Sequence, residues 1–165
     1  VPLINPSHML DGEIIPDQKL TLSNEKFAEL SAYALSKGDV VIGRRGEIGR
    51  CAVVKNERLF CGTGSMFIRI KDSFIPDILQ KIISSDQIKQ FLLNQSVGVT
   101  MKNLNAGIIK ELKIPMIPLP LQNRFYSASQ KVAQKKQEMQ TSLITMTTFF
   151  NSLMQRAFKG ELELK

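Results

Sequence analysis

The chain has 165 residues, of which 43% are hydrophobic and 22% charged, and its formal net charge is +7. This length is enough for one compact domain with an appendage. No apolar run approaches the roughly 18 residues of a membrane span, so the sequence predicts a soluble, cytoplasmic protein without a membrane partner. Both the first 121 residues and the remainder are basic, which fits a nucleic-acid partner, although many basic proteins bind none.

The cysteine and histidine content bears on metal binding and redox state. Cys51 and Cys61 are the only cysteines, and His8, the only histidine, is far from both in the sequence. A metal site needs more ligands than these, and two cysteines without secretory features favour reduced thiols in a cytoplasm. The start at Val1, without a leader, is consistent with a piece of a larger protein. We identify no nucleophile paired with a base and no cofactor loop, so we expect neither catalytic residues nor a metal site.

The first 121 residues carry short and mixed secondary-structure signals. Asp11-Gly12 lies between apolar residues and predicts a hairpin. Further along, the pattern predicts a helix over 23–34, strands over 40–42 and 52–54, a strand interrupted by a glycine turn over 59–70, a helix over 76–93 and a last strand over 108–117. This mixture indicates an α+β fold, with a twisted β-sheet and short helices in a small globular domain.

A basic, glycine-rich connection joins the strands predicted at 40–42 and 52–54. It reads Gly43-Arg44-Arg45-Gly46-Glu47-Ile48-Gly49-Arg50. Glycine lets a backbone approach a phosphate or a groove wall, and arginine forms paired hydrogen bonds with phosphate or with a guanine edge. We therefore take Arg44, Arg45 and Arg50 as candidate DNA contacts. The alternative is a solvated hairpin loop whose arginines contact water.

Polar side chains in two other turns are further candidates. The loop over 95–105 contains Thr100, Lys102, Asn103 and Asn105. Asparagine suits adenine edges, lysine suits guanine edges, and threonine suits phosphate or the thymine methyl group. Ser65, in the glycine turn, is a weaker candidate for a phosphate contact. For both turns the alternative is side chains that bond only their own backbone.

Three prolines mark a domain boundary. Pro115, Pro118 and Pro120 fall within six residues, which predicts an extended, semi-rigid exit from the globular domain. We place a DNA target recognition domain at 1–121 and a long helix at 122–165.

The last third of the chain predicts one continuous helix. Mostly apolar or small residues recur there in alternating steps of four and three, at Phe125, Ser129, Val132, Lys136, Met139, Leu143, Met146, Phe150, Leu153 and Ala157. This heptad seam continues over about four heptads, which favours a coiled coil with a partner helix. Its polar members, Ser129 and Lys136, are of the kind that fixes register or partner choice. The alternative is a helix that folds back along its own domain.

Taken together, these segments resemble the specificity subunit of type I restriction-modification systems. The resemblance rests on residues 37–41, 45–49, 103–104, 108–115, 117–122 and 153–162. In that family a G-D-apolar strand leads to R-x-G-x-x-G, an N-L segment leads to a proline-rich exit, and a long helix ends in a phenylalanine-x-G tail. The order and spacing of the segments agree over nearly the whole chain.

The resemblance implies one half of such a subunit, with one target recognition domain and one helix. The domain is expected to recognise half of a bipartite double-stranded DNA target, and the helix to act as a spacer that docks modification subunits. The restriction subunit is an indirect partner, and a homodimer through the helix is expected for a half subunit. S-adenosylmethionine is expected in the modification subunit, so this chain should bind no cofactor and catalyse nothing.

Two other classes of function remain open from the sequence. The chain is compatible with a coiled-coil scaffold that binds protein, which the absence of salt-dependent DNA affinity would favour. It is also compatible with the recognition portion of a DNA methyltransferase whose catalytic domain lies upstream of Val1. An upstream methyltransferase motif in the native reading frame would support that second class.

Overall fold

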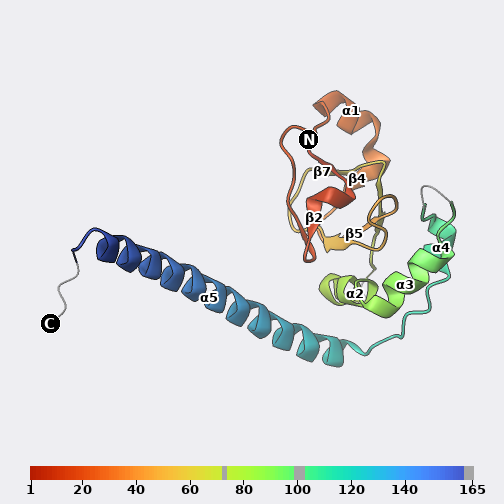
Figure 1. Cartoon of the computed structure of the whole chain (residues 1–165). Coiled ribbons are helices and arrows are strands. Elements are labelled where there is room, and N and C mark those ends of the chain that lie inside the picture. The colour runs from red at the N-terminus through yellow and green to blue at the C-terminus, as the bar shows by residue number, and fades with distance from the viewer. Residues whose placement is uncertain (72–73, 99–102, 162–165) are drawn as a thin grey trace. The chain divides into compact units, whose positions relative to one another are not determined.

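The structure is a computed structural model that describes residues 1–71, 74–98 and 103–161. It divides into two compact units, Val1–Gln122 and Asn123–Lys165. The first unit contains short strands and helices, and the second continues one long helix (Figure 1). The predicted α+β class is therefore confirmed. The boundary predicted after residue 121 lies one residue before the division between the two units.

Strand β5 (Val40–Gly43) is the centre of the first unit. It pairs antiparallel with β6 (Cys51–Val53) on one side and with β8 (Ser65–Ile68) on the other. All four residues of β5 are buried. Its β-branched run suits a strand that is covered on both faces.

A second sheet joins segments that are far apart in the sequence. β7 (Leu59–Cys61) lies between β1 (Leu3–Ile4), with which it is parallel, and β4 (Ala34–Leu35), with which it is antiparallel. The N-terminal residues are thereby fixed to the middle of the globular unit.

The hairpin predicted at Asp11-Gly12 is present. It consists of β2 (Met9–Leu10) and β3 (Glu13–Ile14), paired antiparallel. Asp11 and Gly12 have φ angles of 51° and 87°, the left-handed conformations that a two-residue hairpin of this type requires.

The strands lie between helices (Figure 1). On one side are α2 (Pro76–Ile83), α3 (Asp86–Gln95) and α4 (Ala106–Lys110), and on the other is α1 (Asn24–Glu29). Short 3-10 helices occupy Pro6–His8 and Ser31–Tyr33. The helix predicted over 23–34 is therefore shorter than expected.

Two predictions for the following segment were wrong. The helix expected over 76–93 is two helices, because Ser84 and Ser85 end one and begin the next, and serine favours helix ends over helix interiors. The strand expected over 108–117 is the short helix α4 followed by irregular backbone. There Asn105 Oδ1 accepts the Ile108 N–H at 3.0 Å and so starts a helix turn.

Two apolar clusters lie on opposite faces of β5 and β6. The cluster facing the helices contains Val40, Ile42, Ile48, Cys51, Val53, Leu79, Ile83, Leu92, Leu104 and Ile108. The cluster facing the second sheet contains Ile4, Met9, Leu35, Val41, Ala52, Val54, Leu59 and Cys61. Because neighbouring strand residues point to opposite faces, β5 supplies both clusters and fixes the loops at its ends.

Helix α5 (Leu119–Phe158) has 40 residues. At 1.5 Å per residue its length is about 60 Å. It begins earlier than residue 122, because Pro120 lies in the first turn, where a missing N–H is tolerated.

The first turn of α5 also contains a buried amide. Gln122 is 0% exposed; its Oε1 accepts the Ile75 N–H at 2.8 Å and its Nε2 donates to the Ile117 carbonyl at 2.7 Å. These bonds satisfy the amide and fasten the start of α5 to the residue that precedes α2.

Both thiols are buried and free, and this gives a testable pH dependence. Burial raises the pKa of the Cys61 thiol to about 11, and it also raises the pKa of Cys51. An unfolded thiol loses its proton near pH 8.5. The full stability is therefore present below about pH 8.5 and falls as the pH rises towards 11, because only the unfolded chain releases the proton. We expect urea unfolding to show a Cys61-dependent loss of about 2 kcal/mol by pH 10.5.

The control for this loss is Cys61→Ala, which removes the ionisable group. The difference between the two proteins should shrink as the pH rises, because only the wild type has the Cys61 thiol to lose. Parallel pH profiles for the two proteins would contradict the assignment to Cys61.

Candidate nucleic-acid interface

The connection between β5 and β6 is a tight loop shaped by its glycines. A side chain at Gly43 would place its Cβ 2.5 Å from the Glu47 carbonyl oxygen, so only glycine fits there. Gly46 and Gly49 have φ angles of 72° and 78°, in the left-handed region that glycine favours. The sequence thus dictates a compact loop that presents its arginines at the end of the central strand.

Backbone hydrogen bonds fasten this connection to two other loops. The N–H groups of Arg44 and Arg45 donate to the Gly64 carbonyl at 2.9 and 3.3 Å. The Arg44 carbonyl accepts from the Leu104 N–H at 2.9 Å. Three loops that are distant in the sequence therefore meet at Arg44.

Asn103 links the same loops through both its backbone and its side chain. Its N–H donates to the Val97 carbonyl at 2.8 Å, and its carbonyl accepts from the Val97 N–H at 3.2 Å. Its Oδ1 accepts a hydrogen bond from Arg44 Nε at 3.2 Å. Arg44 and Asn103, which the sequence predicts as separate candidates, are thus in direct contact across 59 positions.

The other two arginines of the connection differ in their surroundings. Arg50 forms an ion pair with Glu47, and its Nη1 donates to the Pro6 carbonyl at 3.5 Å. The side chain of Arg45 is exposed and has no hydrogen bond or ion pair within the described ranges. The guanidinium of Arg45 is therefore free to contact a ligand, whereas that of Arg50 is already engaged by Glu47 and the Pro6 carbonyl.

The remaining predicted contacts are less well placed. Ser65 is 5% exposed, and its buried Oγ has no hydrogen-bond partner within residues 1–71, 74–98 and 103–161, so its hydroxyl does not reach the surface. Asn105 is exposed, but its Oδ1 caps α4. Thr100 and Lys102 lie outside the described residues.

Sequence reasoning missed Val97. Its side chain is 68% exposed. It lies on the same face as that of Asn103, because residues that exchange both backbone hydrogen bonds in an antiparallel pair point the same way. The available signal was a β-branched residue in a loop of mixed polar and apolar residues. Such a side chain suits an apolar contact with a base edge, such as the thymine methyl group.

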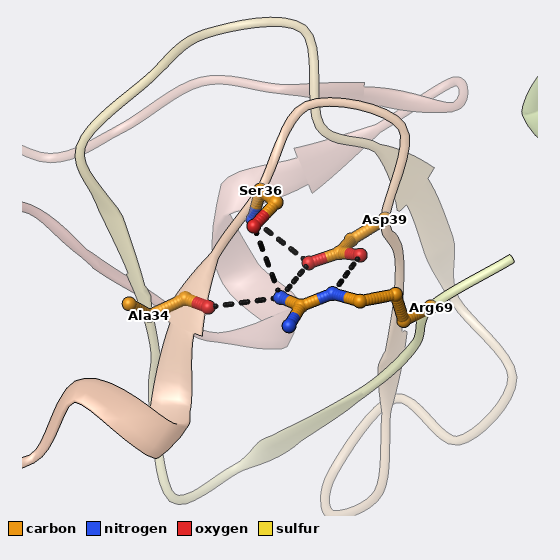
Figure 2. Close-up of polar contacts among 4 residues, drawn as sticks. All are labelled: Ala34, Ser36, Asp39 and Arg69. Carbon is orange, nitrogen blue, oxygen red and sulfur yellow. Dashed lines mark hydrogen bonds and ion pairs between the residues drawn. The ribbon is translucent and has the colours of Figure 1, made fainter.

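The Gly38-Asp39 segment, which contributes to the family resemblance, has a structural role. Asp39 is 2% exposed, and Figure 2 shows how Arg69 clasps its carboxylate. Arg69 Nε and Nη2 donate to the two carboxylate oxygens at 3.0 and 2.8 Å, and the Ser36 N–H donates to Oδ2 at 2.8 Å. Arg69 Nη2 also donates to the Ala34 carbonyl at 3.2 Å. The hydrogen bond to Asp39 raises the pKa of Arg69, so the guanidinium stays charged.

This pair ties together the elements that surround the central strand. Asp39 immediately precedes β5, Arg69 immediately follows β8, and Ala34 belongs to β4. A pair of parallel hydrogen bonds from one guanidinium to one carboxylate fixes the orientation of the two groups as well as their distance. The pair thus connects the sheet that carries the candidate loops to the second sheet.

The predicted seam of α5 lies at the surface of the single chain. Its large apolar members, Phe125, Val132, Met139, Leu143, Met146 and Phe150, are between 52% and 65% exposed. Leu153 is half-buried, and Lys136 and Ala157 are exposed. Phe149 and Met154 flank the seam and are exposed as well. Monomeric proteins seldom expose apolar side chains in a continuous row of this length, and such a row marks a contact surface.

The described part of the chain contains neither a metal-binding cluster nor a membrane-spanning helix. Within it, no group of three or more His, Cys, Asp or Glu side chains is placed to hold a metal ion. None of the helices described is long and apolar enough to cross a membrane.

The fold and the site define a class of protein, a small α+β domain with arginine and amide side chains on joined loops, followed by a long helix with an exposed apolar seam. Residues 1–146 match the family model for the type I restriction modification DNA specificity domain. The chain belongs to this family.

Curated relatives agree with the family. The chain is 24% identical over 172 residues to the type I restriction enzyme EcoBI specificity subunit of Escherichia coli, an alignment that covers 98% of this chain and 35% of that protein. It is 24% identical over 161 residues to the MjaIX specificity subunit of Methanocaldococcus jannaschii, covering 96% of this chain and 33% of that one. The chain thus spans about a third of the length of these relatives.

Solved structures agree with the fold. The HsdS subunit from Thermoanaerobacter tengcongensis superposes with a TM-score of 0.68 at 19% identity, covering 99% of this chain and 45% of that chain. A chain from a structure on complex assembly and conformational transition of the type I R-M system gives 0.67 at 20% identity, covering 98% and 39%. At these identities the likeness establishes the architecture.

Proposed function

We propose that this chain is one half of a type I specificity subunit and that its first unit binds one half of a bipartite double-stranded DNA target. The observation that carries the proposal is the junction of three loops at Arg44, where arginine and amide side chains are fixed at the end of a buried strand. Binding side chains are commonly placed on loops held by a rigid scaffold. Membership of a DNA specificity family supports the same function.

The long helix has a separate role in this proposal. Its exposed seam packs on the same seam of a second copy, so that a homodimer holds two DNA-binding units at a fixed separation. Modification subunits dock on the paired helices, and the restriction subunit joins indirectly. The match to the EcoBI and MjaIX specificity subunits extends over 98% and 96% of the chain and so includes α5, which supports a role for this helix in a specificity subunit.

The chemistry belongs to the partner subunits in this proposal. Methyl transfer from S-adenosylmethionine takes place in the modification subunits, in the cytoplasm, and this chain supplies no catalytic group and no cofactor site. The match to a type I restriction modification DNA specificity domain supports this division of labour.

The test is the salt dependence of DNA binding. We expect fluorescence anisotropy with a labelled duplex library of random sequence to show binding that weakens about 100-fold between 50 and 200 mM salt, the effect of releasing counterions from about four phosphates. The Arg45→Ala variant should bind all sequences more weakly and reduce the slope of log K against log salt by about one. The exposed Arg45 side chain, without a protein partner in the described ranges, is the reason for choosing it.

Three results would decide against parts of this proposal. Binding that is absent at every salt concentration would favour the protein-binding scaffold. An unchanged slope for Arg45→Ala would remove Arg45 from the interface. A native reading frame with a methyltransferase motif upstream of Val1 would favour the recognition portion of a methyltransferase.

A further inference from the structure

The DNA-contacting candidates are not equivalent, and the difference lies in how each guanidinium is held. Arg50 is engaged by Glu47 and by the Pro6 carbonyl. Arg45 is exposed and makes no side-chain hydrogen bond in the described part of the chain. Arg44 is half-buried and has one side-chain hydrogen bond there, from Nε to Asn103 Oδ1 at 3.2 Å.

The one side-chain hydrogen bond that Arg44 makes in the described ranges leaves both Nη nitrogens of the guanidinium free to bind a ligand. Nε points at Asn103, and neither Nη nitrogen has a hydrogen bond within the described residues. Two parallel donors from one arginine match the O6 and N7 acceptors of guanine in the major groove. A carbonyl acceptor at Nε also fixes the plane of the fork, which lowers the rotamer entropy lost on binding.

Asn103 is itself rigidly placed. Its backbone exchanges two hydrogen bonds with Val97, and the neighbouring Leu104 N–H donates to the carbonyl of Arg44. Asn103 therefore fixes the side chain of Arg44, and the adjacent Leu104 fixes its backbone carbonyl. The bond from Arg44 Nε fixes the amide plane of Asn103, so its oxygen and nitrogen are not free to turn together towards the edge of an adenine, which needs both groups.

We propose that Arg44 contacts guanine and determines specificity at one base pair, and that Asn103 is a positioning residue for Arg44 and does not itself read a base. The proposal rests on the proposed function and deepens it. Val97, exposed on the same face as Asn103, lies where an apolar side chain meets the neighbouring base pair. Arg45, by contrast, contacts a phosphate of the DNA backbone.

The test is the selection of bound sequences from a random duplex library, using the full chain alone and with its modification subunit. We expect the wild type to enrich a motif with at least one G·C pair. Arg44→Ala and Asn103→Ala should each lower discrimination at that same pair by about tenfold and leave the other positions unchanged. Asn103→Asp keeps an acceptor for Nε, so it should retain the base preference while its added negative charge weakens binding to all sequences.

A second arginine–asparagine pair provides the matched control. Arg58 Nη2 donates to Asn24 Oδ1 at 2.8 Å on an exposed surface outside the three joined loops. Arg58→Ala and Asn24→Ala should leave the motif as in the wild type. Melting temperatures of all variants identify any that fail to fold, and Arg44→Ala decides the question if Asn103→Ala does not fold.

The possible outcomes distinguish a failure of this inference from a failure of the proposed DNA-binding function. If folded Arg44→Ala retains full discrimination, or loses affinity equally at all positions, Arg44 contacts phosphate or nothing and the inference is overturned. If folded Asn103→Asp loses the preference as Asn103→Ala does, Asn103 reads a base and its positioning role is overturned. A wild type that enriches no sequence and shows no salt-dependent binding overturns the proposed function itself.

Discussion

Replacing Asp39 by alanine is expected to lower the free energy of unfolding by about 3 kcal/mol, because breaking a buried ion pair leaves its hydrogen-bond partners without a replacement. The carboxylate is 2% exposed and accepts from Arg69 and from the Ser36 N–H. Arg69 is half exposed, so water takes over part of its solvation and the loss stays at the lower end of the range for such pairs. Urea unfolding at neutral pH, followed by circular dichroism, measures this loss.

A surface pair provides the control for Asp39. Lys26 and Glu29 form an ion pair at 2.7 Å with both side chains largely exposed. Glu29→Ala should therefore cost under about 0.5 kcal/mol. Asp39→Asn, which keeps the shape and one acceptor oxygen, should fall between the two. A loss below about 1 kcal/mol for Asp39→Ala would show that the pair does not hold the two sheets together.

Placing a charge in the seam of α5 is expected to dissociate the proposed homodimer. Leu143 lies near the middle of the seam and is 60% exposed in the single chain. Leu143→Glu would bring two carboxylates into an apolar contact, so we expect the dissociation constant to rise at least 100-fold, which is about 3 kcal/mol. Light scattering on a sizing column should show twice the mass of one chain for the wild type and the mass of one chain for the variant.

The control for the seam carries the same charge on the opposite face of the helix. Thr148 is exposed and lies off the seam, and Thr148→Glu should leave the dimer intact. Equal dissociation by both variants would point to general charge repulsion. A wild type that is monomeric, with and without the modification subunit, would count against a second copy as the partner and favour a protein-binding scaffold.

Local sequence patterns predicted those elements whose structure depends on neighbouring residues in the chain. The β-branched run before Gly43 gave a buried central strand, because no other element suits such residues between glycine turns. The three-four spacing of α5 gave a long helix with its apolar side chains in one row. The order of these elements along the chain gave the family, which the match over residues 1–146 confirms.

Long-range contacts escaped prediction, since a sequence pattern contains no information on which loops meet. Arg44 and Asn103 were separate candidates, and only the structure joins them. Ser65 looked accessible in a glycine turn but is buried against the core. The segment after Asn105 looked like a strand by its loose alternation, yet a side-chain cap at its start favoured a helix turn.

The pairing of β1 with β7 has a consequence for the synthesis of the protein. Leu3 lies opposite Phe60, and the buried amide of Gln122 closes the same unit much later in the sequence. A nascent chain therefore cannot complete this unit until Gln122 has left the ribosome, and the edge of β1 around Ile4 stays unpaired until β7 has been made. Contacts of such large sequence separation slow folding and lengthen the exposure of aggregation-prone strands. The globular unit depends on such contacts and is therefore expected to fold slowly. Helix α5 is built from local contacts and can form as soon as it emerges from the ribosome.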